Sequence, residues 1–222
     1  MNIRMAVLDI GGTTVHEEGA VLGAFHDALV DVGHLDDLDD AMKTVTTTMG
    51  MSKIEVFRMI LDDEDEAGRA NTAFEHAIEE RITEGEMLPM PGAIEAIDWL
   101  KGQGIAVVIA TGFAPSSRDR LLAHLGWSDV PDLAASPGGR LRGRPYPDVI
   151  LDALITLGVD DVRQVAVVGD TANDLLAGHR AGAGIVAGVL TGSHGRSQLE
   201  AAPHTHILDS IAQLQAVIES SS

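Results

Sequence analysis

A single aspartate at the end of an apolar run constrains this chain more than any other feature. Residues 7–15 read VLDIGGTTV, so Asp9 ends a run with the character of a buried strand, and two glycines and two threonines follow it at once. A charged group that leaves water without a partner costs free energy. We therefore expect Asp9 to lie at the mouth of a sheet, where other groups can reach its carboxylate.

Short runs rich in β-branched residues recur along the chain and alternate with longer helical patterns. Runs that are apolar on both faces are typical of parallel strands covered by helices on each side. This alternation predicts an α/β fold with a doubly wound parallel sheet. The expected strands are 4–10, 104–110, 130–136, 164–170, 183–190 and 204–209, and the expected helices are 92–102, 115–126, 147–157, 171–182 and 208–219.

One interval breaks this alternation. From about residue 17 to residue 88 no convincing strand appears, and four helical patterns follow one another. Such a length is too great for a crossover between strands, which usually takes ~10–15 residues. We therefore expect a helical cap domain at 17–88, inserted into an α/β core of residues 1–16 and 89–222, with LPMPG (88–92) as the return hinge. The expected cap helices are 19–33, 38–50, 52–66 and 71–82.

Composition narrows the kinds of ligand and location that suit the chain. The sequence has no cysteine, which excludes disulfides, thiolate metal sites and a cysteine nucleophile. Its net charge of −19 disfavours nucleic acid and anionic membranes as partners. No run approaches the ~18 apolar residues of a membrane span, and the N-terminal apolar run is too short and too soon broken for a signal peptide. We expect a soluble cytoplasmic protein in which an anionic ligand needs a local positive site.

Polar residues collect at the predicted carboxyl ends of the strands, where open α/β sheets bind their ligands. Asp9 ends the first strand, Thr111 follows the second, and Asp170 ends a later one, with Asp174 one helical turn beyond it. Each of them taken singly is explained equally well as a helix cap or a turn residue. Together, carboxylates from different strands are typical of a Mg²⁺ site, and the basic segment at 140–147 supplies cations for phosphoryl oxygens.

The order of these residues resembles the four motifs of the haloacid dehalogenase superfamily over nearly the whole chain. DIGGTT (9–14) resembles the first motif, Thr111 the second, Arg144 in GRPYP the third, and GDTAND (169–174) the fourth. The resemblance implies an aspartate-nucleophile hydrolase that depends on Mg²⁺. It also implies a helical cap at the place of the insert.

The resemblance further implies roles for individual residues. Asp9 is expected to take the phosphoryl group, and Asp9, the Gly11 carbonyl and Asp170 to hold Mg²⁺, with Asp174 as a ligand or in the outer shell. Bound Mg²⁺ neutralises the two anions that must meet, and glycine lets backbone N–H groups approach the phosphoryl oxygens. The residues expected to bind the substrate or its phosphoryl group are Gly12, Thr13, Gly50, Thr111, Gly112 and Arg144.

Gly11 is the informative departure from the superfamily pattern. Phosphatases and phosphomutases of the superfamily carry an aspartate there, which protonates the leaving oxygen and later activates water. The phosphonatase (phosphonoacetaldehyde hydrolase) subgroup also lacks it, and MGMSK (49–53), Arg144 and TGSH (191–194) are similar to sequences of that subgroup. This resemblance implies that Lys53 forms a Schiff base with the substrate aldehyde, so that the leaving carbon becomes an electron sink.

Three positions differ from the phosphonatase pattern. Val56, Ala20 and Phe113 stand where histidine, cysteine and tyrosine are typical, so the proton-transfer partners around a Schiff base are changed. The expected ligand is a small anionic phosphonate, either phosphonoacetaldehyde or a related compound.

Several alternatives stay open at this stage. The main one is an atypical phosphatase of a small phosphate monoester, and another is a catalytically silent phosphate-binding protein; in both, Lys53 is an electrostatic group only. A dehalogenase is disfavoured because that subgroup is metal-free and the chain keeps Asp170, and Gly11 disfavours a phosphomutase. The sequence leaves the oligomeric state open, with a homodimer as one candidate.

Overall fold

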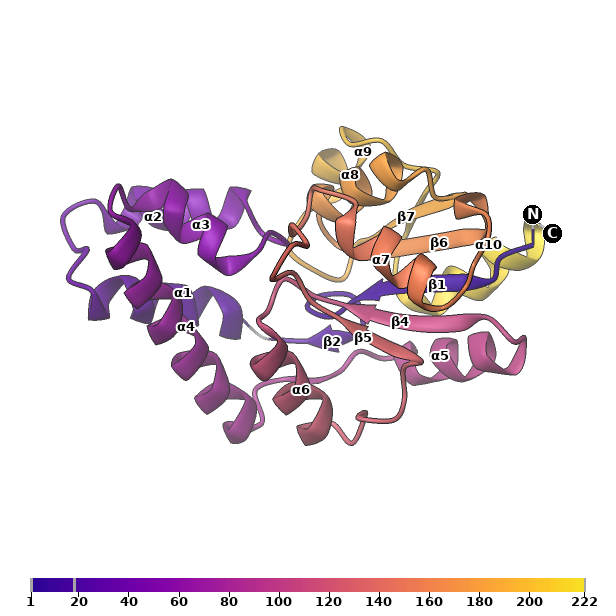
Figure 1. Cartoon of the computed structure of the whole chain (residues 1–222), viewed down its shortest axis with the longest axis horizontal. Helices are drawn as coiled ribbons and strands as arrows, with labels where there is room; N and C mark the ends of the chain where they lie inside the picture. Colours follow the sequence, from indigo (N-terminus) through magenta and orange to yellow (C-terminus); the bar gives the residue numbers. More distant parts are fainter. Residues whose placement is uncertain (1, 18, 222) are drawn as a thin grey trace.

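A six-stranded sheet forms the centre of the larger of two lobes (Figure 1). In this computed structural model, which describes residues 2–17 and 19–221, the strands run in the order β5-β4-β1-β6-β7-β8 and neighbouring strands are parallel. The predicted α/β class is confirmed. The strands are β1 (Met5–Asp9), β4 (Ala106–Ala110), β5 (Leu133–Ala135), β6 (Val165–Gly169), β7 (Ile185–Val189) and β8 (His206–Leu208).

Alternate residues of the central strand β1 belong to two separate hydrophobic layers. Ala6 and Leu8 pack in one layer, and Met5 and Val7 pack in the other. Both faces are buried, which is why the strand is apolar throughout. The first layer is covered by α5 (Ala93–Gly102), α6 (Pro115–His124) and α10 (Leu214–Ser220), and the second by α7 (Asp148–Thr156) and α8 (Ala172–Ala181).

The strand order brings three strand ends together. β1 lies between β4 and β6, with Asp9 opposite Ala110 and Leu8 opposite Val168. The chain moves from one side of β1 to the other after β5, and such a switch point is where open α/β sheets bind ligands. The residues that follow β1, β4 and β6 therefore meet at one edge.

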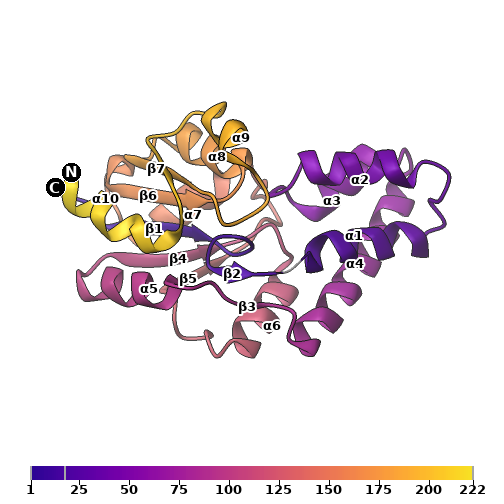
Figure 2. The ribbon, with the colours of Figure 1, turned by 180° about the vertical axis from the view of Figure 1, so that it is seen from behind.

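Four helices form the smaller lobe, which lies beyond this edge (Figure 2). They join the core through a two-stranded antiparallel ribbon that the sequence analysis did not anticipate, because strands of two residues carry no periodic pattern. Three phenylalanines from three of the helices, Phe25, Phe57 and Phe74, pack together at the centre of this lobe. The elements are β2 (Val15–His16), α1 (Ala20–Asp31), α2 (Leu38–Thr47), α3 (Lys53–Ile60), α4 (Glu64–Glu84) and β3 (Leu88–Pro89).

Two cap helices differ from their predicted bounds. The helix expected at 52–66 ends at Ile60, and the next one begins at Glu64 instead of residue 71. Asp63 accounts for the break, because its side chain accepts a hydrogen bond of 2.8 Å from the Glu66 N–H and so caps the new helix. The acidic segment at 62–66 thus spans the start of the second helix, and the carboxylates in its first turn complement the helix dipole.

The C-terminal part of the core also differs from expectation. The helix predicted at 208–219 is a short 3₁₀ turn, Ile211–Gln213, followed by α10. A further helix, α9 (Arg196–Glu200), was not expected; at five residues it is too short to show helical periodicity.

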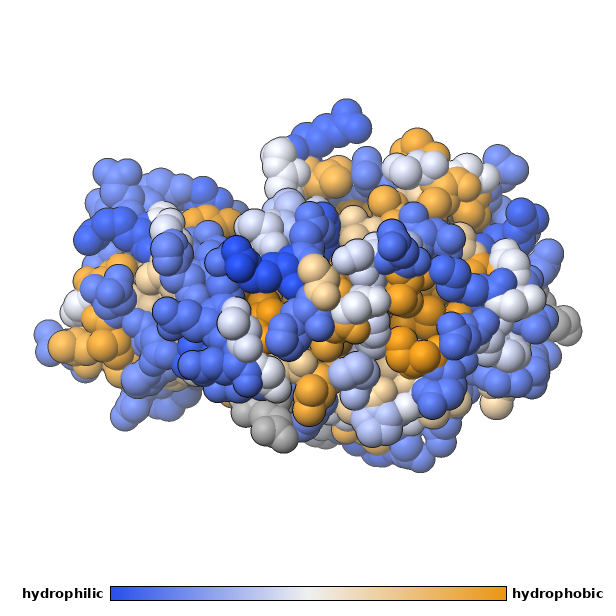
Figure 3. All heavy atoms as spheres, turned by 90° about the horizontal axis from the view of Figure 1, so that it is seen from below, coloured by the Kyte–Doolittle hydropathy of each residue, from blue (hydrophilic) through white to orange (hydrophobic). Residues whose placement is uncertain are grey.

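Figure 3 shows one face of the whole molecule in space-filling form. The smaller, helical lobe is mostly hydrophilic on this face, whereas hydrophobic residues lie among hydrophilic ones over the core. Among the described residues, every helix is too short or too polar to cross a membrane.

Candidate active site

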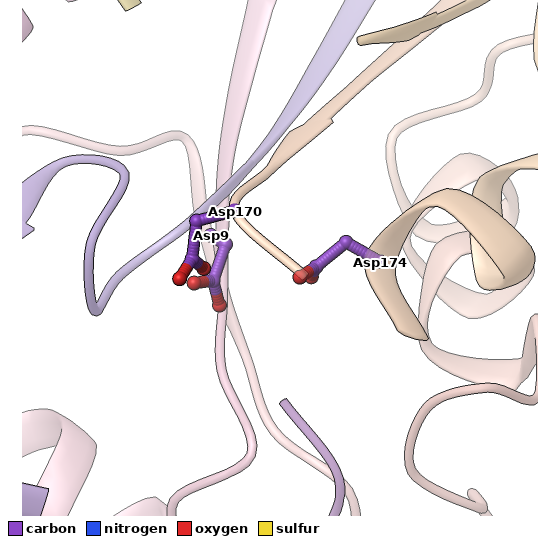
Figure 4. A group of neighbouring side chains, drawn as sticks. All are labelled: Asp9, Asp170 and Asp174. Atoms are coloured by element: carbon purple, nitrogen blue, oxygen red, sulfur yellow. The ribbon is translucent and has the colours of Figure 1, made fainter. Parts of the chain in front are cut away.

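Three buried aspartates meet at the carboxyl edge of the sheet (Figure 4). Asp9 ends β1, Asp170 follows β6, and Asp174 lies in the first turn of α8; each offers an oxygen within 4.8 Å of the others. The carboxylates of Asp9 and Asp170 lie side by side, and that of Asp174 approaches them from its helix (Figure 4). The structure therefore brings together all three predicted metal-binding carboxylates.

Burial disfavours the charged forms of Asp9 and Asp170. It raises the pKa of Asp9 to about 6, although Arg144 lowers it. Burial also raises the pKa of Asp170, and the nearby charges of Asp9 and Asp174 add to that rise. Crowded, desolvated oxygens of this kind fit a hard divalent cation, and all the side-chain donors are oxygen atoms. The residues present therefore suit Mg²⁺.

Asp174 differs from the other two because both its oxygens already have partners. Its Oδ1 lies 2.8 Å from Arg144 Nη1. Its Oδ2 accepts hydrogen bonds from the Thr171 N–H, at 3.1 Å, and from the Thr171 hydroxyl, in a capping box at the start of α8. The two roles expected of Asp174, ligand or outer shell, stay predictions.

Arg144 is a largely buried cation held directly against the expected nucleophile. Its Nη1 lies 2.6 Å from Asp9 Oδ1, and its Nη2 donates to the Ala110 carbonyl at 2.8 Å. Burial alone would lower the pKa of Arg144, but the charges of Asp174 and Asp9 raise it above its ordinary value. A fixed guanidinium at this place can hold phosphoryl oxygens beside Asp9.

Two threonine hydroxyls of the expected phosphate site are also buried. Thr111 Oγ1 accepts a hydrogen bond of 3.1 Å from the Phe113 N–H and keeps its own hydrogen to donate. Thr13 Oγ1 has no hydrogen-bond partner among the described residues. A buried hydroxyl without a partner is costly, and a ligand oxygen would satisfy it.

Lys53, the first residue of α3, is buried where a lysine is ordinarily solvated. It lines one cavity together with Asp9, Thr111 and Arg144. Aromatic rings surround its ammonium group, with Nζ lying 5.3 Å, 5.6 Å and 5.9 Å from the centroids of Phe113, Phe25 and Phe74.

The surroundings of Lys53 act on its pKa in both directions. Burial lowers the pKa of Lys53 and is the dominant influence, while the charges of Glu17, Asp9 and Glu75 raise it and Arg144 lowers it further. The net effect is a lowered pKa, so a larger fraction of the amine is neutral than in water. A neutral, desolvated lysine is the form that attacks carbonyl carbons.

Two glutamates beside Lys53 were not anticipated from the sequence. Glu17 lies next to Gly11: a Cβ added at Gly11 would sit 3.8 Å from Glu17 Cδ and 3.9 Å from its Oε1. Its Oε2 accepts a hydrogen bond of 3.0 Å from the Val21 N–H at the start of α1. Burial raises the pKa of Glu17, whereas the charge of Lys53 lowers it.

Glu75 comes from α4 and accepts a hydrogen bond from the Ser117 hydroxyl of α6. Burial raises its pKa, and the Ser117 hydrogen bond and the Lys53 charge oppose that rise. A charged residue three positions after the first motif was the available signal for Glu17. No sequence pattern connects Glu75 to residues so distant in the chain.

The MGMSK segment of the cap lies against the loops of the core. The Asn173 side chain donates to the Met49 carbonyl at 2.8 Å, and a Cβ at Gly50 would lie only 2.5 Å from Thr171 Oγ1. A Cβ at Gly112 would collide with the Met51 carbonyl. Gly50 and Gly112 therefore have a packing role, because they let two backbones touch; the substrate-binding role expected of them stays a prediction.

The TGSH segment forms hydrogen bonds with the first and fourth motifs. The Thr191 hydroxyl donates to the Gly12 carbonyl at 2.6 Å, and the Ser193 N–H donates to Asp170 Oδ2 at 2.6 Å. Gly12 has a positive φ of 72°, and a Cβ there would run into Asp170. The packing of neighbouring protein atoms therefore already requires a glycine at position 12. The expected approach of a phosphoryl group to its backbone is a separate reason.

Comparison with known proteins agrees with this arrangement. Residues 3–182 match the sequence profile of the haloacid dehalogenase-like hydrolases. Among curated proteins, the chain is 30% identical over 214 residues to the probable phosphatase IndB of Dickeya dadantii, which covers 95% of this chain and 91% of that protein. It is also 30% identical over 209 residues to a phosphonoacetaldehyde hydrolase of Pseudomonas aeruginosa, covering 86% and 74% respectively.

Solved structures show the same fold. A phosphonoacetaldehyde hydrolase-like protein from Oleispira antarctica superposes with a TM-score of 0.86 at 23% identity, over 99% of this chain and 92% of that one. A predicted phosphatase from Clostridium acetobutylicum superposes with a TM-score of 0.84 at 19% identity, over 99% and 100%.

Proposed function

The chain belongs to the haloacid dehalogenase-like hydrolases, and within that family we propose that it is a Mg²⁺-dependent, phosphonatase-like enzyme. It would cleave the C–P bond of phosphonoacetaldehyde or a related small phosphonate. The observation that carries this proposal is the buried Lys53 amine, which lines the cavity of Asp9 beside a first motif in which Gly11 offers no acid. Curated relatives named as phosphonoacetaldehyde hydrolases support the same substrate class.

In the proposed reaction, neutral Lys53 attacks the aldehyde carbon of the substrate, and loss of water leaves a protonated imine. The Asp9 carboxylate then attacks phosphorus, the C–P bond breaks, and its electron pair moves into the carbon skeleton to form an enamine. Protonation of that carbon and hydrolysis of the imine release the free aldehyde and the lysine. Water finally hydrolyses the aspartyl phosphate to inorganic phosphate.

Other residues hold the reacting groups in place. Arg144 and the Thr111 hydroxyl would bind phosphoryl oxygens, and Asp174 keeps Arg144 charged and oriented. Mg²⁺ bound by Asp9, Asp170 and the Gly11 carbonyl would reduce the repulsion between the nucleophile and the substrate. The aromatic rings around Lys53 exclude water from the amine.

Borohydride trapping tests the covalent role of Lys53. Protein mixed with phosphonoacetaldehyde and borohydride should carry a reduced adduct on Lys53, located by mass spectrometry of its peptides. Lys53→Arg should lose both the adduct and C–P cleavage, because a guanidinium does not form the imine. Lys43→Arg is the matched control, since Lys43 is an exposed lysine of the same lobe. An active arginine variant without any adduct would refute this mechanism.

Phosphate monoester hydrolysis is the second candidate function. The carboxyl of Glu17 beside Gly11 favours it, because it places an acid near the position where phosphatases carry one. The relative named as a probable phosphatase also supports it. Product analysis separates the two: a phosphonatase releases aldehyde and phosphate and needs Lys53, whereas a phosphatase releases alcohol and phosphate and tolerates Lys53→Arg.

A further inference from the structure

A second and much larger cavity lies between the cap and the core. It has a volume of about 1170 Å³ and shares Lys53, Gly112, Phe113 and Arg144 with the cavity that contains Asp9. Pockets for drug-sized ligands span roughly 300–1,000 Å³. A two-carbon phosphonate would occupy only a small part of this space. The cavity therefore has room for a longer molecule that extends outward from Lys53.

The lining of this large cavity is basic, in contrast to the rest of the chain. The sequence has 15 lysines and arginines against 34 acidic residues, yet the cavity gathers six cations and only two carboxylates, Glu55 and Glu75. This excess of positive charge would attract and retain an anion. The six cations are Lys53, Arg58, Arg140, Arg142, Arg144 and Arg180.

Some of these cations already have carboxylate partners that occupy them. Arg144 is held by Asp9 and Asp174, and Arg58 is held by Glu55 and Glu64. Arg140 is almost fully exposed, and its contact with Asp152 is long, at 3.9 Å. Arg142 is paired with Asp148 through Nε and Nη2 only, and Arg180 contacts a backbone carbonyl, so these two exposed cations keep donors to spare.

Both of these arginines lie near the ring of Tyr146. The Arg142 guanidinium lies 4.1 Å from the centroid of the Tyr146 ring, and that of Arg180 lies 6.0 Å from it. Arg142 uses Nε and Nη2 to bind Asp148, and Arg180 uses Nη1 to bind the Pro145 carbonyl. A guanidinium has five N–H donors, so both retain donors for a ligand.

We propose that Arg142 and Arg180 form a subsite for a second anionic group, a carboxylate, at the end of the substrate distant from phosphorus. The inference rests on the proposed function in assuming that Arg144 and Thr111 hold the phosphorus group. Planar guanidinium groups suit carboxylates, because two N–H donors can face the two oxygens. The substrate class is then a phosphonate or phosphate that carries a carboxylate beyond the reacting end.

Calorimetric binding of three arylphosphonates, with Mg²⁺ present, tests this subsite without any need for turnover. The ligands are phenylphosphonate, 4-carboxyphenylphosphonate and 4-carbamoylphenylphosphonate; the amide matches the carboxylate in shape and lacks its charge. The wild type should bind the carboxylate severalfold, up to about fivefold, more tightly than the amide, since an exposed ion pair contributes up to about that much.

Variants of the two arginines test whether they cause the preference for the carboxylate over the amide. Arg142→Gln and Arg180→Gln should each reduce the ratio of the two dissociation constants toward one and leave phenylphosphonate binding unchanged. Arg163→Gln, which changes an exposed arginine outside the cavity, should keep the wild-type ratio. A wild type without a carboxylate preference, no measurable binding of the carboxylate, or a preference that survives in both variants would overturn the proposal. C–P cleavage is assayed separately, so its failure does not alter this result.

Discussion

Gly11 leaves space that the carboxyl group of Glu17 lies against. The sequence shows only that Gly11 lacks a side chain, whereas the structure places the Glu17 carboxyl within 4 Å of the missing Cβ. An aspartate introduced at Gly11 would therefore face another carboxylate. Like charges at close range destabilise one another, and one of them takes up a proton.

This arrangement predicts the outcome of restoring the phosphatase acid. Gly11→Asp alone should lower the melting temperature and give little esterase activity, because the new carboxylate is repelled by Glu17. Gly11→Asp combined with Glu17→Gln should regain stability and raise turnover of phosphate monoesters, since general acid catalysis typically contributes ~10²–10⁴-fold. Thermal melts and phosphate release on both variants, with Glu17→Gln as the matched control, measure this. Equal melting temperatures and rates for the single and double variants would contradict it.

The individual residues of the site were predictable to different degrees. Asp9, Thr111, Asp170 and Asp174 follow from the rule that ligands bind at strand ends, and the structure brings them to one edge. Their catalytic roles stay predictions. Glu75 lay beyond sequence reasoning, because it approaches Lys53 only through the packing of α4 against α6.

At the scale of elements, the core of the cap also forms the wall around Lys53. Phe74 of α4 is fully buried, packs against Phe25 and Phe57, and lies within reach of the lysine ammonium. The same ring therefore contributes to the stability of the helical lobe and to the desolvation of the amine.

Phe74→Ala should consequently affect both properties. Removing a buried phenylalanine costs about 3–5 kcal/mol of unfolding free energy, and the space left would admit water to Lys53 and raise its pKa. Leu35→Ala is the control, because Leu35 is an exposed hydrophobic residue of the same lobe and should change stability by less than about 0.5 kcal/mol. Urea denaturation and the pH dependence of adduct trapping on Lys53 measure the two effects. Unchanged stability in Phe74→Ala would contradict this account of the cap.

Elements with a long or strong pattern were predicted well, and short ones were not. All six core strands were found, because each carries an apolar run. The ribbon of β2 and β3 and the helix α9 were missed, since two to five residues are too few to show a period. The break between α3 and α4 depends on one capping interaction of Asp63, which competes with a continuous helical pattern.

At the scale of the whole molecule, the charge of the site couples metal binding to stability and pH. The pKa of Asp9 is about 6 in the folded protein, against 3.8 for an ordinary aspartate. Between these values the folded chain keeps a proton that the unfolded chain has lost, so stability without metal falls as the pH rises through this window. The shift corresponds to roughly 3 kcal/mol, and the raised pKa of Asp170 acts in the same direction.

Bound Mg²⁺ should restore the stability that the folded protein loses as the pH rises. At pH 8, above the pKa of Asp9, the Asp9 carboxylate is ionised, so added Mg²⁺ should raise the melting temperature clearly, as expected from about 2.7 kcal/mol at a hundredfold excess over the dissociation constant. At pH 5 protons compete for the same oxygens, and the increase should be small. Calorimetry at both pH values measures it, with Asp170→Asn as the variant that should lose the effect and Asp161→Asn as a surface control. An equal increase of the melting temperature in Asp170→Asn would mean that the ion binds at a different site.

The contact between the Met51 carbonyl and Gly112 has a consequence for timing. No side chain separates the two backbones there, so cap and core meet tightly beside Lys53, and a molecule held there leaves through the larger cavity that Lys53 also lines or when the lobes part. Such movements take microseconds to milliseconds. Under the proposed reaction, water reaches the aspartyl phosphate by the same two routes. Loss of the phosphoryl group to a wrong acceptor would then depend on how freely solvent passes through that cavity and on the lifetime of the closed state.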